Sequence, residues 1–193
     1  MKEITRTIEL PDGRILPLTA DRYDINELKQ ELRDSKEKYR RDPSLRNYLL
    51  LHYVQAQLDD AKGKTVEAAE NLLYVLNPDN LAAQFPDTPG FHKQLLQYQD
   101  TASFLVELLL YLGRLDEALR WADALYHNAE DNFYGTTIVP YAMNLYGCCL
   151  EAAGRKSDAG YMYERSLSEA EAVISDMQSL RDSVKINLDE QWK

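Results

Sequence analysis

The sequence is poor in cysteine, glycine and proline, and it has no long apolar run. Its two cysteines, Cys148 and Cys149, are adjacent, so they cannot form a disulfide framework. Eight glycines and seven prolines in 193 residues are too few for a disordered, collagen-like or many-turned β chain. The longest apolar stretch, 104–112, contains Glu107 and is well short of the roughly 20 residues that a membrane span needs. We therefore expect a globular protein that does not insert into a membrane.

Basic residues are outnumbered by acidic ones. Lys and Arg total 22 and Asp and Glu total 32, which gives a formal net charge of −10. A general phosphate binder needs the opposite sign, so we exclude nucleic acid as the main partner. The first residues, MKEITRTIELPDGR, lack the apolar core of a signal peptide. Together with the free cysteines, this favours a cytoplasmic location.

The first 18 residues differ from the rest of the chain. Two apolar runs flank Pro11-Asp12-Gly13, and Asp-Gly in that setting predicts a β-hairpin. Arg6 interrupts the apolar face of the first run. Because an isolated hairpin is barely stable in water, we expect it to dock on the helices or to pair with a partner strand. We divide the chain into an N-terminal hairpin, 1–18, and a helical domain, 19–193.

From Thr19 onward the apolar residues recur at helical spacing. We expect helices over about 21–41, 43–62 (with Asp42-Pro43 at its start), 65–76, 88–112, 115–131, 137–153 and 157–184, and a long loop over 77–90. The run FLVELLLYL is apolar nearly all round, which is typical of a central helix. The last helix is the longest and is expected to cap the array.

Three turns share one pattern, in which a glycine ends a helix and an alanine follows five residues later. Glycine suits the left-handed backbone position that closes a helix, and alanine allows the next helix to approach closely. The pairs are Gly63 and Ala68, Gly113 and Ala118, and Gly154 and Ala159. Such an internal repeat carries more weight for the fold than any single motif.

These segments resemble tetratricopeptide repeats. The best matches are LVELLLYLGRLDEALRWADAL and MNLYGCCLEAAGRKSDAGYMYERSL, where Gly147, Gly154, Ala159 and Tyr163 match the family's positions. The turn glycines are 50 and 41 residues apart, longer than the family period of roughly 34, and the second spacing is similar to repeats of the kinesin-light-chain type. The resemblance covers about 45–175 and implies an all-α, right-handed stack of antiparallel helix pairs. A plain helical bundle is the alternative.

The resemblance also implies a concave face, lined by the first helix of each pair, that binds another chain. Position by position, this groove contains Leu50, Tyr53, Gln57, Asp60, Ser103, Glu107, Tyr111, Tyr141, Asn144, Cys148 and Glu151. The set is aromatic and acidic and has no Lys or Arg. It therefore favours a peptide segment with basic residues and apolar anchors. It disfavours the acidic tails of chaperones, because carboxylates need donors and only Asn144 can serve.

No catalytic pattern is visible in the sequence. His52, His92 and His127 lack metal-ligand spacing, and Cys148 and Cys149 are interpreted as small buried hydrophobic residues. We predict no enzyme activity, no cofactor and no metal. The first hypothesis is a protein-interaction adaptor or scaffold. The alternative is a structural or regulatory protein that forms a homodimer through the hairpin or the last helix. An enzyme whose site is invisible in the sequence is a third reading.

Overall fold

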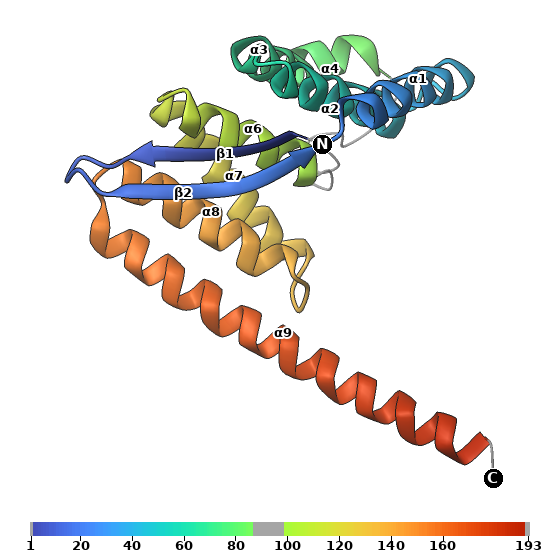
Figure 1. Ribbon diagram of the computed structural model, residues 1–193, viewed down its shortest axis with the longest axis vertical. Coiled ribbons are helices and arrows are strands. Elements are labelled where there is room, and N and C mark those ends of the chain that lie inside the picture. The colour runs from blue at the N-terminus through green and yellow to red at the C-terminus, as the bar shows by residue number, and fades with distance from the viewer. Residues whose placement is uncertain (1, 87–98, 192–193) are drawn as a thin grey trace.

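A computed structural model describes residues 2–86 and 99–191, with side-chain environments for 6–16, 18, 24–86 and 99–179. It is mostly helical, with a small antiparallel hairpin at the N-terminus (Figure 1). The described elements are β1 (Lys2–Glu9), β2 (Ile15–Tyr23), α1 (Ile25–Arg41), α2 (Leu45–Ala61), α3 (Thr65–Val75), α4 (Pro78–Gln84), α6 (Gln99–Tyr111), α7 (Leu115–Asn132), α8 (Ile138–Ala152) and α9 (Lys156–Gln191).

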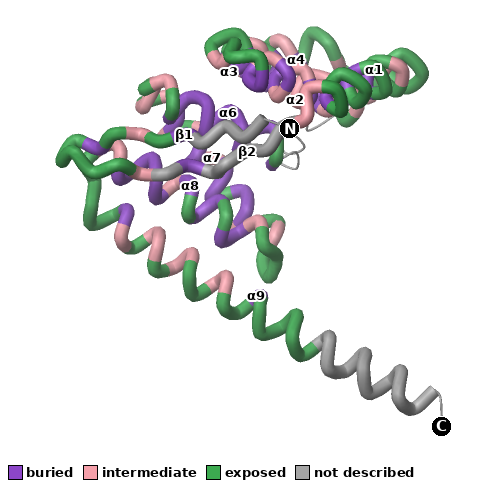
Figure 2. Tube along the Cα trace, viewed as in Figure 1, coloured by how far each residue is buried: buried purple, intermediate pink, exposed green. Residues whose placement is uncertain are grey.

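Most helices pack against the helix that follows in the chain, and α3 also packs on α6. Contacts join α1 to α2, α2 to α3, α3 to α6, α6 to α7, α7 to α8 and α8 to α9, while α6 also contacts α2 and α8 (Figure 1). Every residue of α6 from Thr101 to Leu110 is buried, so the prediction of a central helix is confirmed (Figure 2). The apolar core is built around this helix.

The three glycine turns share the same backbone geometry. The φ angles of Gly63, Gly113 and Gly154 are 80°, 71° and 76°, in the left-handed region. In each turn the residue after the glycine donates its N–H to a carbonyl five residues back, at 2.9 Å: Lys64 to Asp59, Arg114 to Leu109 and Arg155 to Leu150. This is the hydrogen bond of the Schellman motif. The alanines that follow, Ala68, Ala118 and Ala159, are buried, as expected.

The packing of α8 on α9 depends on a missing side chain. A Cβ atom at Gly147 in α8 would lie 2.6 Å from Cε1 of Tyr163 in α9. The Tyr163 ring therefore occupies the space that any larger residue at position 147 would need. These are two of the positions on which the resemblance to tetratricopeptide repeats is based.

The predicted boundary between hairpin and helices, at residue 18, is wrong. β2 continues to Tyr23 because β1 begins at Lys2 and offers pairing partners up to that residue. The helix expected from Asp21 begins at Ile25 instead. Asp24 caps it, since its carboxylate accepts hydrogen bonds from the backbone N–H groups of Asn26 (2.8 Å) and Glu27 (3.3 Å).

Two predictions around the prolines also need correction. Asp42 ends α1 rather than starting α2, which Ser44 precedes. The expected loop over 77–90 contains the short helix α4, because Asn77 caps it with Pro78 at its first position. The start of the helix predicted from Thr88 lies outside the described residues. Within the described part of the chain, no helix combines the length and apolarity of a membrane span.

Candidate functional site

The N-terminal hairpin lies against a face formed by α2, α6 and α8, here called the α2–α6–α8 face (Figure 1). Leu10 and Leu18 are buried, and Ile8 and Leu16 pack on the main core. Thr7, between the inward positions, is exposed, as expected for a strand with one buried face. The hairpin thus docks on the helices, which is one of the two outcomes we expected.

Arg6 does not interrupt the inner face of the hairpin but anchors it. The residue is 1% exposed and forms an ion pair with Asp60 at the end of α2. Its guanidinium carbon lies 5.7 Å from the centre of the Phe104 ring in α6. Asp60 also accepts a hydrogen bond of 2.9 Å from the hydroxyl of Thr65. Asp60, which we predicted to face a partner, therefore binds an arginine of its own chain.

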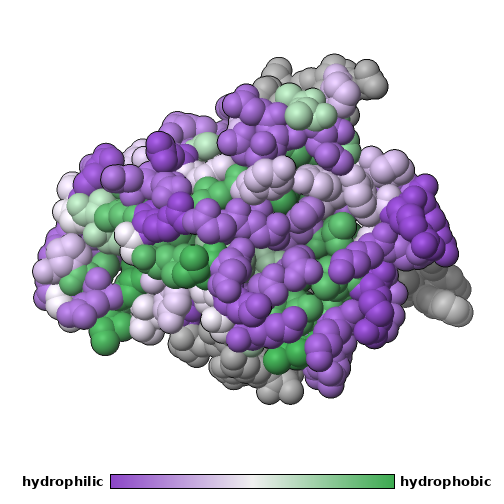
Figure 3. All heavy atoms as spheres, turned by 90° about the horizontal axis from the view of Figure 1, so that it is seen from above, coloured by the Kyte–Doolittle hydropathy of each residue, from purple (hydrophilic) through white to green (hydrophobic). Residues whose placement is uncertain are grey.

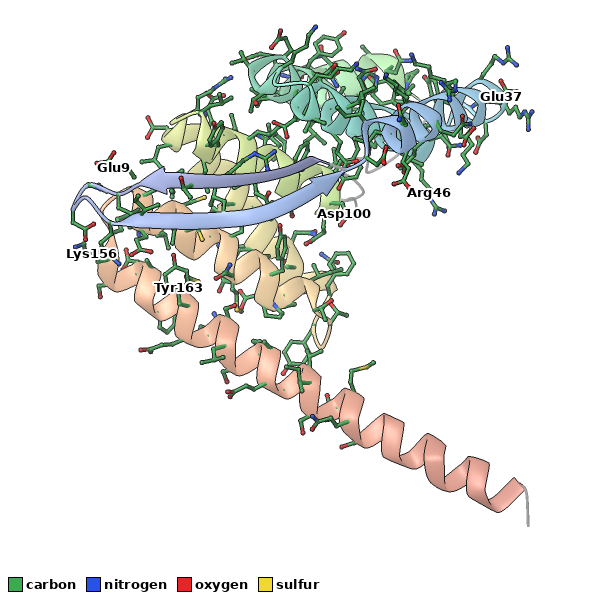
Figure 4. The ribbon with its side chains drawn as sticks, in the orientation of Figure 1. Glu9, Glu37, Arg46, Asp100, Lys156 and Tyr163 are labelled. Atoms are coloured by element: carbon green, nitrogen blue, oxygen red, sulfur yellow. The ribbon has the colours of Figure 1, made fainter. Side chains whose placement is uncertain are left out.

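The turn of the hairpin is held at the other end of the same face. Arg14 forms an ion pair of 2.7 Å with Glu151 in α8. Lys156, at the start of α9 near the hairpin turn (Figure 4), forms one of 2.7 Å with Asp12. The hydrogen bonds from Lys156 and then Arg14 hold the pKa of the Asp12 carboxyl well below its ordinary value. Glu151, a second predicted groove residue, is thus also engaged by the hairpin.

Burial disfavours the ionised forms of Tyr163, Cys148 and Cys149. The Tyr163 hydroxyl donates to Glu151 at 2.8 Å, and burial raises the pKa of Tyr163 far above its ordinary value. Burial also raises the pKa of the Cys148 and Cys149 thiols. A reactive thiol needs a lowered pKa, so these environments fit small buried hydrophobic residues. Among the described residues, no three His, Cys, Asp or Glu side chains gather as a metal site would require; His92 lies outside them.

A small cavity remains open on the α2–α6–α8 face. Its volume is about 150 Å³, and its lining consists of Tyr53, Gln57, Asp100, Ser103, Phe104, Glu107 and Tyr141. Five of the residues predicted for the groove therefore meet around one cavity. The Tyr141 hydroxyl donates a hydrogen bond of 2.6 Å to the buried Glu107 carboxylate, which ties α8 to α6.

Two neighbouring cavities, of about 350 and 260 Å³, extend this space toward the start of α6. Six residues that line these two cavities were not predicted for the groove: Arg46, Gln99, Asp100, Thr101, Thr137 and Ile138. The helical spacing was an available signal, because Gln99 and Asp100 precede Ser103 by one turn. The Gln99 amide is buried, and its nitrogen and oxygen have no hydrogen-bond partner among the described residues. Arg46 and Asp100 are exposed and line the same cavity (Figure 4).

The other predicted groove residues do not join this space. Tyr111 is exposed at the end of α6, Asn144 is exposed on α8, and Cys148 is buried in the main core. None of the three lines any of the three cavities described above, whereas Leu50 lines the cavity of about 260 Å³. The predicted groove is thus divided into a part filled by the hairpin and an open part near Tyr53 and Tyr141.

Comparison with family models, with curated proteins and with solved structures found no match. The likeness to tetratricopeptide repeats therefore stands on the glycine turns, on Gly147 and on Tyr163. It remains a resemblance of sequence motifs.

Proposed function

We propose that this chain is a non-catalytic protein-interaction module, an adaptor or scaffold with a right-handed, tetratricopeptide-like stack of helix pairs. Its concave face, formed by α2, α6 and α8, binds a peptide segment with basic residues and apolar anchors. The observation that carries the proposal is that this face already holds an extended segment of that chemistry, which is the chain's own hairpin.

The hairpin indicates what the face selects. Arg6 fits between the Asp60 carboxylate and the Phe104 ring, and Leu10 and Leu18 occupy apolar positions along the same segment. Extended peptides bind in this way when alternate side chains enter pockets. A net charge of −10 adds attraction for a basic partner at a distance.

The partner segment is expected to occupy the open part of the groove. Tyr53 and Tyr141 supply partly exposed aromatic rings, and such rings are enriched at protein interfaces. Asp100 supplies an exposed carboxylate at the rim, where a Lys or Arg of the partner can pair with it. The open part of the groove thus offers the same kinds of site, a carboxylate and an apolar surface, as the part that holds the hairpin.

A binding assay with designed peptides tests the proposal. We expect peptides that alternate arginine and leucine to bind the intact chain, and peptides with glutamate in place of arginine to bind at least several-fold more weakly. Asp100→Asn and Tyr53→Ala should weaken binding, measured by fluorescence anisotropy, whereas Asn144→Ala should not, because Asn144 lines none of these cavities. Preference for the acidic peptides, or no effect of Asp100→Asn, contradicts the proposal.

A second candidate function is self-association by exchange of the hairpin between two copies. It is favoured by the short connection, since Asp24 alone separates β2 from α1. Exchange of an identical element is a common route to dimers. Sedimentation over a wide concentration range separates the candidates, because a monomer at every concentration excludes exchange.

A further inference from the structure

Arg6 is bound by two kinds of group, an aromatic ring and a carboxylate. Its guanidinium lies over the Phe104 ring and pairs with Asp60. A guanidinium is planar and weakly hydrated, so it stacks on rings and enters buried ion pairs more readily than the compact, strongly hydrated ammonium of lysine. We call a set of ring and carboxylate that binds one guanidinium an arginine site.

Arg165, in α9, occupies a second arginine site. Its guanidinium carbon lies 5.9 Å from the centre of the Tyr126 ring and 5.8 Å from that of the Tyr161 ring. The guanidinium also pairs with Glu130 at 2.6 Å. In the described part of the chain, each cation that lies over a ring is thus an arginine that also pairs with a carboxylate.

The cavity of about 150 Å³ contains the same kinds of group. Tyr53, Phe104 and Tyr141 supply one ring each from α2, α6 and α8, and Asp100 supplies a carboxylate. Apolar residues reach the surface only in small groups on the face seen from above (Figure 3), so three rings around one cavity are a marked concentration of aromatic surface.

This cavity differs from the two occupied sites in its charge. No Lys or Arg is among the described residues of its lining. Asp100 forms no ion pair with another described residue, whereas Asp60 and Glu130 each pair with an arginine. The buried carboxylate of Glu107 adds negative charge to the same wall. The cavity therefore favours a cation that comes from outside the described part of the chain.

The walls of the cavity are held by contacts with one another. The centres of the Tyr53 and Phe104 rings are 5.9 Å apart, and the ring planes are nearly perpendicular, at 88°. The hydrogen bond of 2.6 Å from Tyr141 to Glu107 restrains the third ring. Cavities of about 150 Å³ admit benzene, and a guanidinium is also planar and has fewer heavy atoms. The space is thus preorganised and large enough for one guanidinium.

We propose that this cavity is a third arginine site, which binds an arginine side chain of the partner in preference to lysine. The inference rests on the proposed function, because it names the residue of the bound segment that enters the open part of the groove. The guanidinium stacks on the rings and pairs with Asp100, as Arg6 does with Phe104 and Asp60. Lysine gains less here, because its ammonium gives up a stronger hydration shell and cannot stack.

Peptides that differ at one position test this preference. Three versions of a leucine- and serine-containing peptide carry arginine, lysine or citrulline at the centre, and citrulline is a neutral isostere of arginine. Their binding to the intact chain is measured by fluorescence anisotropy. We expect the arginine peptide to bind about fivefold or more tightly than either of the others.

Variants of the chain identify the cavity. Tyr141→Leu should weaken the arginine peptide about fivefold because one ring is lost, whereas Tyr141→Phe keeps the ring and should retain the preference for arginine. Asp100→Asn should reduce the advantage of arginine over citrulline, because the carboxylate charge is lost. Tyr74→Leu is the matched control, since Tyr74 is a tyrosine of α3 that is 62% exposed and lines none of the three cavities. Circular dichroism verifies that each variant keeps its helical content.

Equal binding of the arginine and lysine peptides overturns the inference but leaves the proposed function in place, since the groove would still bind a basic segment. An effect of Tyr141→Leu no larger than that of Tyr74→Leu also overturns it. Methylguanidinium and methylammonium chloride separate the converse case. If no peptide binds but methylguanidinium alone shifts the NMR signals of Tyr53 and Ser103, the arginine site stands and the proposed function fails. If neither the peptides nor methylguanidinium bind, both fail.

Discussion

The Tyr163 ring packs closely against Gly147 because glycine has no Cβ atom. In a helix interior, glycine to alanine ordinarily stabilises by about 0.5–1 kcal/mol. Here the added atom would lie 2.6 Å from the Tyr163 ring, whose hydroxyl is bonded to Glu151. We expect Gly147→Ala to lower the free energy of unfolding by about 1–3 kcal/mol, the range of overpacked cores. Urea denaturation measures it.

Gly160, in α9, is the matched control. An added Cβ there meets nothing within 4 Å. Gly160→Ala should therefore stabilise, by up to about 1 kcal/mol. In a Tyr163→Ala background, Gly147→Ala should lose its cost, because the ring is gone. Equal effects at both glycines would show that the contact with Tyr163 is unimportant.

The buried pair of Arg6 and Asp60 allows a second prediction at this scale. Arg6→Met leaves an uncompensated buried carboxylate, so we expect a loss of about 3–5 kcal/mol in unfolding free energy. Arg6→Met combined with Asp60→Leu should recover most of the loss, because an apolar pair can replace a buried ion pair. Denaturation of both variants measures the coupling. A single variant within about 1 kcal/mol of the parent would show that the pair is not effectively buried.

His52 makes stability depend on pH. Burial lowers the pKa of His52, and the hydrogen bond to Asn71, 3.0 Å long, only partly offsets it. As the pH falls, the unfolded chain thus binds the proton first, near the ordinary histidine pKa of 6.5. Unfolding free energy should fall as pH drops from about 6.5 toward the lower folded pKa. The variant His52→Gln should lack this pH dependence of the unfolding free energy. The variant His127→Gln, at an exposed histidine, should retain it.

At the scale of elements, each glycine turn depends on the backbone conformation of one residue. Gly113 has a φ of 71°, and an added Cβ meets nothing within 4 Å. The cost of Gly113→Ala is therefore conformational, about 1–2 kcal/mol. Gly113→Asn should cost less, since asparagine tolerates the left-handed region. Thermal denaturation of both variants checks the order, and equal costs would argue against a conformational origin.

The elements that could be predicted from the sequence are those with a local cause. Gly63, Gly113 and Gly154 indicated their turns because a left-handed residue and a following apolar period are readable over a few positions. The cap of α4 was also readable at Asn77-Pro78, but the prolines favoured a loop. The extension of β2 to Tyr23 was not, because it depends on pairing with Lys2.

The candidate site was predictable only in part. The resemblance to tetratricopeptide repeats implied Tyr53, Glu107 and Tyr141 as groove residues, and these three meet around one cavity. It could not show that Arg6 would bind Asp60, because 54 residues separate them and neither has a local signal for the other. Arg6 therefore looked like an interruption in an apolar face.

At the scale of the whole molecule, burial predicts an order of local stability. α6 is buried from Thr101 to Leu110, whereas α9 is exposed from Ile174 to Ser179. We expect amide hydrogen exchange to be slowest in α6 and faster along the second half of α9, because local opening costs least where few contacts are lost. Mass spectrometry of exchanged peptides measures the order. Equal protection in both helices would indicate that α9 is covered.

The helices on which the hairpin docks are synthesised well after the hairpin itself. During synthesis the strands leave the ribosome first, Asp60 follows 54 residues after Arg6, and Glu151 follows 137 residues after Arg14. Until α6 and α8 have emerged, the face on which the hairpin docks is incomplete, and the hairpin exposes unpaired strand edges. Docking of the hairpin is thus a late event in biogenesis. Before it docks, the exposed strand edges make the nascent chain prone to aggregation.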